Sequence, residues 1–530
     1  MLGAAAAGAL STLAHVHTEA WWLGLLAAAF LAQAVWRAPV AVAAWAGWAF
    51  GTAWMVAATW WLFISMHRYG GMPAPLAAAA VLALGAALSL YWAAAMGLAA
   101  RWRTGRARWD VPAFAAAWLM AELARGPWFT GFPWAASGYA QVDAPLAAWA
   151  PWVGVYGMGA WVAVLGAAFA WMWGGPDLRH EQRARFAALS VSPRPLWRRA
   201  LVPGLALIIA GAPALLPRHF TSSTGELTVS LVQTAVAQDE KFDPGRLGRL
   251  LEDLQSALSR ARGQLVVAPE TAVPLLPQDL PPAVWADLAS AFTVAGGQRA
   301  ALVGVPLTTA AGGYSNSVVA WGGPARAASA QAPADEAGMP MTYRYDKHHL
   351  VPFGEFIPAG FRWFVNLMHI PLGDFDRGAV VQPSYGFAGQ RLAPNICYED
   401  LFGEELAQRF HDPEGAPTLL VNLSNIAWFG PTVAIDQHLH ISRLRSLELQ
   451  RPMLRATNTG ATAVINHRGQ VRAWFKPQER GVLEASAEGR EGLTPYASWA
   501  GRWGLTPLWV LALVAMGAAG MAARRMRSGM

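Results

Sequence analysis

The chain has 530 residues, of which 55% are apolar and only 14% carry a charged side chain. Soluble globular proteins carry about 25% charged residues, so the composition excludes an ordinary water-soluble protein as well as a disordered one. The single cysteine, Cys397, excludes an intrachain disulfide framework and a cysteine-based zinc or iron–sulfur site. The net charge is +7, but the basic residues stand in short clusters beside apolar runs, which indicates membrane topology and not nucleic-acid binding.

Apolar runs fill the first 217 residues, and one more lies near the C-terminus. Most of them reach or approach the length of about 18 residues that a helix needs to cross a bilayer. Two runs are weaker, because 2–15 is short and Ala-rich and 111–124 includes Glu122. In chain order the runs are 2–15, 20–36, 41–65, 74–99, 111–124, 148–172, 200–217 and 506–523. They predict seven transmembrane helices, a polar stretch and an eighth helix.

Arginine clusters predict the orientation of these helices. The clusters follow the fourth, sixth and eighth runs, within residues 101–108, 179–199 and 524–527. Cytoplasmic loops carry the excess of basic residues, so we expect these loops and both termini in the cytoplasm. Three domains follow from this topology: a transmembrane domain, an outward-facing periplasmic domain, and a last helix with a basic tail. Their predicted bounds are 1–219, 220–497 and 498–530.

The outward-facing region alternates strand-like and helix-like patterns, which predicts one layered α/β domain. The strand-like stretches are 227–232, 265–268, 301–306, 317–321, 392–397, 418–423 and 463–466. The helical patterns are 247–262, 283–295, 404–410 and 437–449. Residues 322–340, rich in Ala, Gly and Pro, are expected to form a flexible surface loop.

A carboxylate, Glu270, follows the apolar stretch Val266-Val267-Ala268-Pro269. Open α/β sheets bind their ligands at the carboxyl ends of the strands, so Glu270 is a candidate site residue. Acidic residues at strand-to-helix turns also cap helices, and taken alone the position favours that second role.

Lysine is rare in this chain, which has only Lys241, Lys347 and Lys476 among its 40 basic residues. Lys347 stands in the segment Tyr345-Asp346-Lys347-His348-His349, after a short polar stretch. A compact ammonium is suited to stabilising a developing anion, so Lys347 is the second candidate. An ordinary surface lysine is the alternative.

Neither pair of neighbouring histidines is expected to hold a metal ion. His348 and His349 are adjacent on an extended segment, so their side chains point to opposite faces. His438 and His440 lie two residues apart in a helical pattern and therefore do not share a helix face.

Cys397 ends the predicted strand 392–397 and precedes acidic residues and a helical stretch. A thiol at such a turn lies near backbone N–H groups, which favour a thiolate and can stabilise an oxyanion. A lone cysteine can also be an inert buried residue, and the local pattern leaves both interpretations open.

Considered together, Glu270, Lys347 and Cys397 resemble the catalytic triad of the nitrilase, or carbon–nitrogen hydrolase, superfamily. With seven spans before this domain and one after it, the whole chain resembles the apolipoprotein N-acyltransferases. The other matching motifs are Gly131-Phe132-Pro133-Trp134, Gly138-Tyr139, Gly154-Val155-Tyr156-Gly157, residues 347–355, Cys397-Tyr398-Glu399 and residues 451–460. One departure is Phe242, which follows Lys241 where the family often has a tryptophan.

The resemblance implies eight transmembrane helices joined to a nitrilase-like α-β-β-α sandwich in the bacterial inner membrane. It implies transfer of an acyl chain from the sn-1 position of a phospholipid, typically phosphatidylethanolamine, to the N-terminal amine of S-diacylglyceryl-Cys in apolipoproteins. Cys397 would carry the chain as a thioester, with Glu270 as general base and Lys347 as oxyanion stabiliser. The supporting residues, for catalysis or for the shape of the pocket, would be Glu355, Tyr398 and Glu399. The reaction requires no metal or organic cofactor.

Two other functions fit parts of the pattern. A membrane-anchored nitrilase-type amidohydrolase would need one anchor, so eight spans argue against it. A lipid transporter with a degenerate outer domain is disfavoured by the intact Glu, Lys and Cys set. Glu122 and Arg125, three residues apart in a predicted membrane helix, form either a functional site or an interfacial structural pair.

Overall fold

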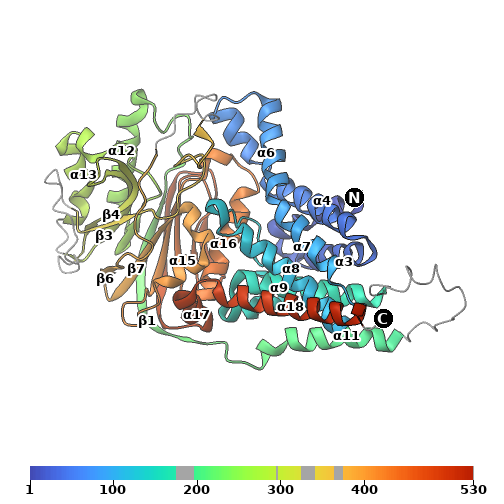
Figure 1. Ribbon diagram of the computed structural model, residues 1–530. Helices are drawn as coiled ribbons and strands as arrows, with labels where there is room; N and C mark the ends of the chain where they lie inside the picture. The colour runs from blue at the N-terminus through green and yellow to red at the C-terminus, as the bar shows by residue number, and fades with distance from the viewer. Residues whose placement is uncertain (175–195, 294–296, 324–340, 363–373, 529–530) are drawn as a thin grey trace, which may run out of the picture. The chain divides into compact units, whose positions relative to one another are not determined.

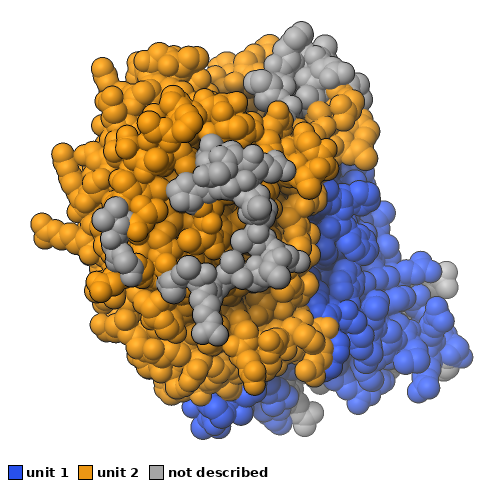
Figure 2. Space-filling model, turned by 90° about the vertical axis from the view of Figure 1, so that its left-hand side faces the viewer, with its two compact units in different colours: residues 1–60, 75–218, 503–530 blue, residues 61–74, 219–502 orange. Residues whose placement is uncertain are grey.

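A computed structural model describes residues 1–174, 196–293, 297–323, 341–362 and 374–528 (Figure 1). The chain forms two compact units (Figure 2). Unit 1 comprises residues 1–60, 75–218 and 503–530, and unit 2 comprises residues 61–74 and 219–502. Most of the basic cluster at 179–199 and most of the loop predicted at 322–340 lie outside the described residues.

Unit 1 is built from helices rich in Ala, Leu, Val and Trp. They are α1 (Leu2–Ser11), α2 (Leu13–Val16), α3 (Trp22–Arg37), α4 (Val40–Thr59), α6 (Ala74–Leu88), α7 (Leu90–Arg101), α8 (Ala107–Arg125), α9 (Ala150–Met172), α11 (Leu196–Ala210) and α18 (Thr506–Ser528). Within the described residues, five helical stretches are long and apolar enough to cross a membrane. These are Thr18–Arg37, Val40–Thr59, Ala74–Arg101, Pro145–Met172 and Thr506–Ser528. Leu2–Val16 and Arg199–Ala214 are apolar but shorter.

The outer faces of these helices are apolar as well. Ile208 of α11 and Val514 of α18 have 74% and 64% of their surface exposed, and other aliphatic side chains of α18 are similarly open. Contiguous apolar surface of this kind is unfavourable in water and favourable in lipid. Unit 1 is therefore the membrane-embedded part of a multi-pass protein.

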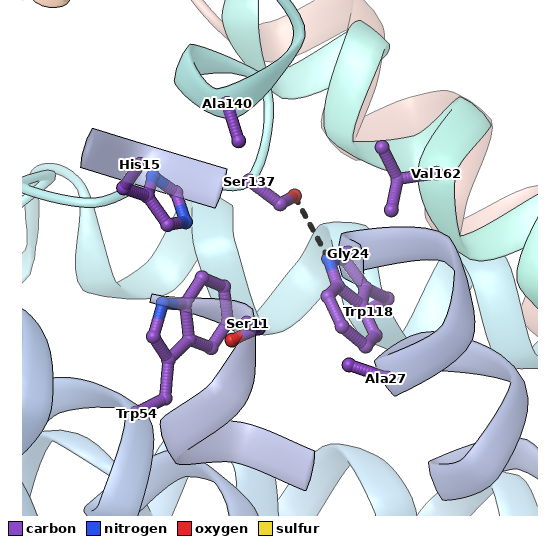
Figure 3. A pocket seen from close by; sticks show the side chains of 9 residues that line it. All are labelled: Ser11, His15, Gly24, Ala27, Trp54, Trp118, Ser137, Ala140 and Val162. Atoms are coloured by element: carbon purple, nitrogen blue, oxygen red, sulfur yellow. Dashed lines mark hydrogen bonds between the residues drawn. The ribbon is translucent and has the colours of Figure 1, made fainter. Parts of the chain in front are cut away.

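A small pocket lies among the helices of unit 1 (Figure 3). Helices α1, α2, α3, α4, α8 and α9 and the segment after α8 line it, with Ser11, His15, Gly24, Ala27, Trp54, Trp118, Ser137, Ala140 and Val162. The indole of Trp118 donates a hydrogen bond to Ser137 Oγ at 3.2 Å, drawn as the dashed line in Figure 3. None of the predicted catalytic residues lines this pocket.

Glu122 and Arg125 of α8 are both buried, and both hold the segment that follows the helix. Glu122 Oε1 accepts a hydrogen bond from the backbone N–H of Ser137 at 2.7 Å. Arg125 Nη1 donates to the backbone carbonyls of Phe132 and Trp134, each at 2.6 Å. These contacts favour the structural role that the sequence left open for the pair.

Unit 2 contains two six-stranded sheets, with the strand orders β12-β1-β2-β3-β4-β5 and β11-β10-β9-β8-β7-β6. The strands of the first sheet are β1 (Thr221–Gln233), β2 (Leu265–Val267), β3 (Ala300–Thr308), β4 (Tyr314–Gly322), β5 (Tyr343–Asp346) and β12 (Gly481–Gly492). Those of the second are β6 (Tyr385–Phe387), β7 (Gln390–Ile396), β8 (Leu419–Ser424), β9 (Met453–Thr457), β10 (Thr462–Ile465) and β11 (Val471–Phe475). In each sheet three central strands are parallel, and the outer pairs are antiparallel.

The two sheets pack face to face, and helices cover their outer faces. The central core joins side chains of both sheets, such as Leu231 and Val267 with Val421 and Leu454. The first sheet is covered by α12 (Pro244–Arg260) and α13 (Pro282–Thr293), and the second by α15 (Gly403–Gln408) and α17 (Pro495–Trp503), while α16 (Ala434–Leu449) follows β8. Unit 2 is thus an α-β-β-α sandwich, as the family resemblance implied.

Each predicted strand and helix of unit 2 overlaps an observed element, but β5, β6, β9, β11 and β12 were not predicted. The predicted strands were near-continuous apolar runs, which is how strands buried on both faces read. The missed strands are short, half-exposed or polar. In β9, for example, the fully buried Arg455 and Thr457 interrupt the apolar pattern.

The predicted membrane run 41–65 is too long. Helix α4 ends at Thr59, and residues 61–74 belong to unit 2. Within unit 2, Trp61 Nε1 donates to Gln437 Oε1 at 3.1 Å, and its ring lies 4.3 Å from that of Phe429. The apolar side chain that extended the predicted helix therefore packs against protein.

A substitution at Gly304 tests how closely the core supports the turn that carries Glu270. A Cβ atom at Gly304 of β3 would lie 2.5 Å from Pro269 O and 2.7 Å from Glu270 Cα, so an added methyl group must displace this turn. We expect Gly304→Ala to lower the midpoint of thermal unfolding, since overpacking of a core costs about 1–3 kcal/mol. Gly248→Ala is the control, because no atom lies within 4 Å of the added carbon on α12. Equal unfolding midpoints for the two variants would contradict the close contact.

Candidate active site

The three candidate residues follow strands of both sheets. Glu270 comes three residues after β2, Lys347 comes directly after β5, and Cys397 comes directly after β7. β2 and β7 are central strands with parallel neighbours, so their carboxyl ends lie where α/β sheets present ligand-binding residues.

Lys347 is a buried ammonium between two carboxylates. Its side chain is 1% exposed, and Nζ donates to Glu355 Oε1 at 2.8 Å and to Glu270 Oε1 at 3.2 Å. Burial alone would lower the pKa of Lys347, but the negative charges of Glu270 and Glu355 raise it above its usual value. The amine is therefore charged, and the surface-lysine interpretation is wrong.

The Glu270 carboxylate is held by donors on both of its oxygens. Asn316 Nδ2 donates to Glu270 Oε1 and to Glu355 Oε1, each at 2.7 Å, and so bridges the two acids. The backbone N–H of Asn425 donates to Glu270 Oε2 at 2.8 Å. These partners belong to strands and loops of both sheets, so Glu270 does not serve as a helix cap.

Cys397 is partly buried and has a left-handed backbone conformation, with φ at 51°. Ser424 Oγ donates to Cys397 Sγ at 3.4 Å, and the next residue, Asn425, contacts Glu270, which links thiol and carboxylate through one turn. Burial and the charge of Glu270 raise the pKa of the thiol to about 12, against the opposing effect of Lys347. The expectation that this turn favours a thiolate is therefore wrong for the resting site, and the reaction needs a base.

Of the supporting candidates, Glu355 contacts Lys347 directly, whereas Glu399 acts on the backbone. Glu399 accepts hydrogen bonds from the N–H groups of Ile396 at 2.6 Å and His348 at 2.7 Å, which are the neighbours of Cys397 and Lys347. Burial raises the pKa of Glu399, and these hydrogen bonds oppose the rise. Glu399 therefore ties together the two strand ends that carry the thiol and the ammonium.

Tyr398 is 6% exposed and packs against aromatic rings. Its ring lies 5.3 Å from that of Phe402, in an edge-to-face arrangement, and 5.8 Å from that of His349. It thus contributes to the shape of the region beside Cys397.

Sequence reasoning missed Lys241, which is a second buried lysine at the site. Lys241 Nζ donates to the backbone carbonyl of Glu270 at 3.0 Å, and its side chain is buried. Burial lowers the pKa of Lys241 to about 8, although the negative charge of Glu270 raises it in part. Lys347 was chosen as a candidate because lysine is rare in this chain, and the same signal could have identified Lys241. The neighbouring Phe242 is largely exposed.

Asn316, Ser424 and Asn425 were also missed. Asn316 lies within β4, Ser424 ends β8 and Asn425 follows it. Polar residues inside or at the end of otherwise apolar, buried strands need hydrogen-bond partners, and that was the available signal.

Among the described residues, no group of three or more His, Cys, Asp or Glu side chains could hold a metal ion. His348 Nδ1 lies 2.8 Å from the carbonyl oxygen of Gly378, and His349 Nδ1 lies 3.0 Å from Glu405 Oε1. The two rings thus have separate protein partners.

The site combines a thiol, a carboxylate that can accept its proton, and a fixed ammonium. This set is suited to acyl transfer through a thioester, because the carboxylate can activate the thiol and the ammonium can stabilise an oxyanion.

Comparisons with known proteins place both parts of the chain in one family. Residues 7–168 match the model of the apolipoprotein N-acyltransferase N-terminal domain, and residues 228–490 match the carbon-nitrogen hydrolase model. The apolipoprotein N-acyltransferase of Verminephrobacter eiseniae is 50% identical, over 92% of this chain and 89% of that protein. Those of Ralstonia nicotianae and Bordetella bronchiseptica are 44% and 42% identical, over 93% and 96% of this chain and 88% and 95% of those proteins. The chain belongs to the apolipoprotein N-acyltransferase family.

Proposed function

We propose that this protein transfers an acyl chain from the sn-1 position of a phospholipid to the N-terminal amine of S-diacylglyceryl-Cys in apolipoproteins. The observation that carries the proposal is the buried contact of Lys347 with Glu270, linked through the Ser424–Asn425 turn to the thiol of Cys397. The relatives' activity and the apolar helices of unit 1 support a lipid donor, for which we propose phosphatidylethanolamine.

In the first half-reaction, Cys397 Sγ attacks the ester carbonyl as Glu270 takes the thiol proton. Lys347 and a backbone N–H near Cys397 stabilise the oxyanion of the tetrahedral intermediate. When the intermediate collapses, the C–O bond breaks and the leaving alkoxide takes the proton from Glu270. The products are a lysophospholipid and a thioester on Cys397.

In the second half-reaction, the α-amine of the apolipoprotein attacks the thioester carbonyl. Glu270 accepts the proton that the amine loses, and Lys347 again stabilises the oxyanion. The C–S bond then breaks, and the sulfur regains the proton from Glu270. Glu355 orients Lys347, Glu399 fixes the two strand ends, and Tyr398 shapes the pocket.

We also propose eight transmembrane helices in the bacterial inner membrane. Besides the five long apolar helices, α8 and the two shorter apolar helices supply three further spans. The domains are then 1–219, 220–497 and 498–530, with the catalytic domain in the periplasm and both termini in the cytoplasm, as the arginine clusters indicate.

The first prediction from the proposed function concerns this topology. A reporter that is active only in the periplasm, fused after Arg218, should be active, whereas the same reporter fused at Met530 should be inactive. Seven spans precede the first fusion and eight precede the second, which puts them on opposite sides. An inactive reporter in the first fusion would place Arg218 in the cytoplasm and contradict the span count.

The second prediction concerns the acid–base pair. Glu270→Gln keeps the size of the side chain but loses the base, so the rate of thioester formation should fall about a hundredfold or more. Lys347→Arg should also be inactive, because a planar guanidinium cannot replace a compact ammonium between two carboxylates. The rates are measured by mass spectrometry of the acyl adduct over time.

Lys476→Arg is the matched control, since Lys476 is exposed and pairs with Glu479. It should keep the wild-type rate. Near-normal thioester formation in Lys347→Arg would show that Lys347 has no part in catalysis.

The third prediction separates a transferase from a hydrolase. Wild-type protein incubated with phospholipid and no acceptor should accumulate a thioester on Cys397 and release one lysophospholipid. A diacylglyceryl-Cys peptide should then discharge the thioester to an N-acyl product. Cys397→Ser should form no lasting acyl-enzyme, since a hydroxyl is far less nucleophilic than a thiolate. Rapid release of free fatty acid without peptide, with no acyl-enzyme, would favour the amidohydrolase-type alternative.

A further inference from the structure

Behind the catalytic turn, unit 2 buries a polar network that the mechanism above does not use. Asp400 lies three residues after Cys397, and its carboxylate contacts His438, Ser442 and Arg455. Asp400 Oδ1 lies 3.0 Å from His438 Nε2, and Oδ2 accepts from Ser442 Oγ at 2.5 Å and from Arg455 Nη1 at 3.4 Å. All four residues are at most 1% exposed.

The hydrogen bonds define the state of the His438 ring. Arg455 Nη2 lies 2.7 Å from His438 Nδ1, and since a guanidinium can only donate, Nδ1 must accept. The proton of the neutral ring is then on Nε2, where it is donated to Asp400. Burial and the charge of Arg455 lower the pKa of His438, which agrees with a neutral imidazole.

The charges of the network balance within it. Although burial alone would raise the pKa of Asp400, its contacts with His438, Arg455 and Ser442 lower it, so the carboxylate is ionised. One carboxylate thus faces one guanidinium across a neutral ring. Burying such a pair is costly and brings little net stability, which points to a role in fixing one geometry.

This network reaches the backbone of Cys397. Arg455 Nη1 donates to Asn422 Oδ1 at 3.3 Å, and Asn422 Nδ2 donates to the carbonyl oxygen of Cys397 at 3.3 Å. Cys397 has a positive φ, a conformation that costs a non-glycine residue about 1–3 kcal/mol unless the surroundings hold it.

We propose that Asp400, His438 and Arg455 are positioning residues of the acyl-transfer reaction. Through Asn422 they hold the carbonyl group of Cys397 in its strained conformation, and this keeps Sγ against the Ser424–Asn425 turn that also holds Glu270. The inference rests on the proposed role of Cys397 as nucleophile. His438, for which the sequence analysis expected no metal, thus helps to hold the thiol of Cys397 in position.

The test uses the fact that Cys397 is the chain's single cysteine, so a thiol reagent reports on this residue alone. In full-length His438→Gln, Sγ moves away from the base, and the rate of Cys397 alkylation by iodoacetamide at pH 7 should fall about tenfold or more. The kcat for acyl transfer should fall by about ten- to a hundredfold, the range expected for a displacement of about 1 Å. The KM for phospholipid should stay within about twofold, since the network does not touch the substrate.

Glu448→Gln is the matched control. Glu448 is also fully buried on α16, where it pairs with Arg445 at 2.9 Å. This variant should lose thermal stability but keep the wild-type alkylation rate and kcat. Should His438→Gln fail to fold, Ser442→Ala removes only one hydroxyl of the network and should lower both rates at least about threefold.

Unchanged or faster alkylation in the network variants would overturn the proposal. So would equal losses of kcat in His438→Gln and Glu448→Gln, because these would reflect stability alone. If wild-type protein forms no acyl-enzyme, the proposed function fails, but the alkylation rates still decide whether the network positions Cys397.

Discussion

The rest of the catalytic site depends on the burial of one ammonium between two carboxylates. Lys347, Glu270 and Glu355 have at most 12% of their side-chain surface exposed, and an unpaired charge in such surroundings would cost far more than folding can supply. The two carboxylates together carry one more negative charge than the single ammonium can neutralise. Asn316, the backbone N–H of Asn425 and, at the carbonyl of Glu270, Lys241 compensate for that excess. Since Asn316 lies in β4, and Glu270, Lys347 and Asn425 follow β2, β5 and β8, the site exists only when both sheets are assembled.

Burial and the same negative charge together determine the state of the thiol. The negative charge keeps Lys347 protonated, and burial together with the charge of Glu270 raises the pKa of Cys397, so that Cys397 rests as a neutral thiol. A site of this kind does not hold a reactive thiolate in the absence of substrate. In the proposed reaction the thiol is activated when the ester is bound, because proton transfer to Glu270 and oxyanion stabilisation by Lys347 then occur in the same step. This arrangement suits the proposed reaction of Cys397 with a lipid ester.

What could be predicted from the sequence depended on how local the physical signal was. Strands β2, β3, β7 and β8 are buried on both faces and appear in the sequence as apolar runs. Glu270 follows β2 and Cys397 follows β7, whereas Lys347 follows β5. The partners that hold Glu270 were not predictable in this way, because Asn316 and Asn425 lie 46 and 155 residues from it in the chain. Likewise, the contact of His438 with Asp400 spans 38 residues and that of Arg455 spans 55. Hydrogen bonds of this separation leave no periodic trace in a sequence, only polar residues in apolar elements.

The assembly of the site also involves the segment 61–74, which lies between two membrane helices in the chain. By connectivity it joins α4 to α6, yet it folds with unit 2. The rings of Trp61 and Tyr69 contact those of Phe429 and Trp428, which lie shortly after the Ser424–Asn425 pair. Arg68 pairs with Asp239 at 3.6 Å, two residues before the buried Lys241. Two of the backbone segments that hold Glu270 therefore pack against a loop whose ends are membrane helices. A fragment that begins at residue 219 would lose these contacts and expose the aromatic rings, so the segment 61–74 belongs to the folded sandwich although membrane helices flank it in the chain.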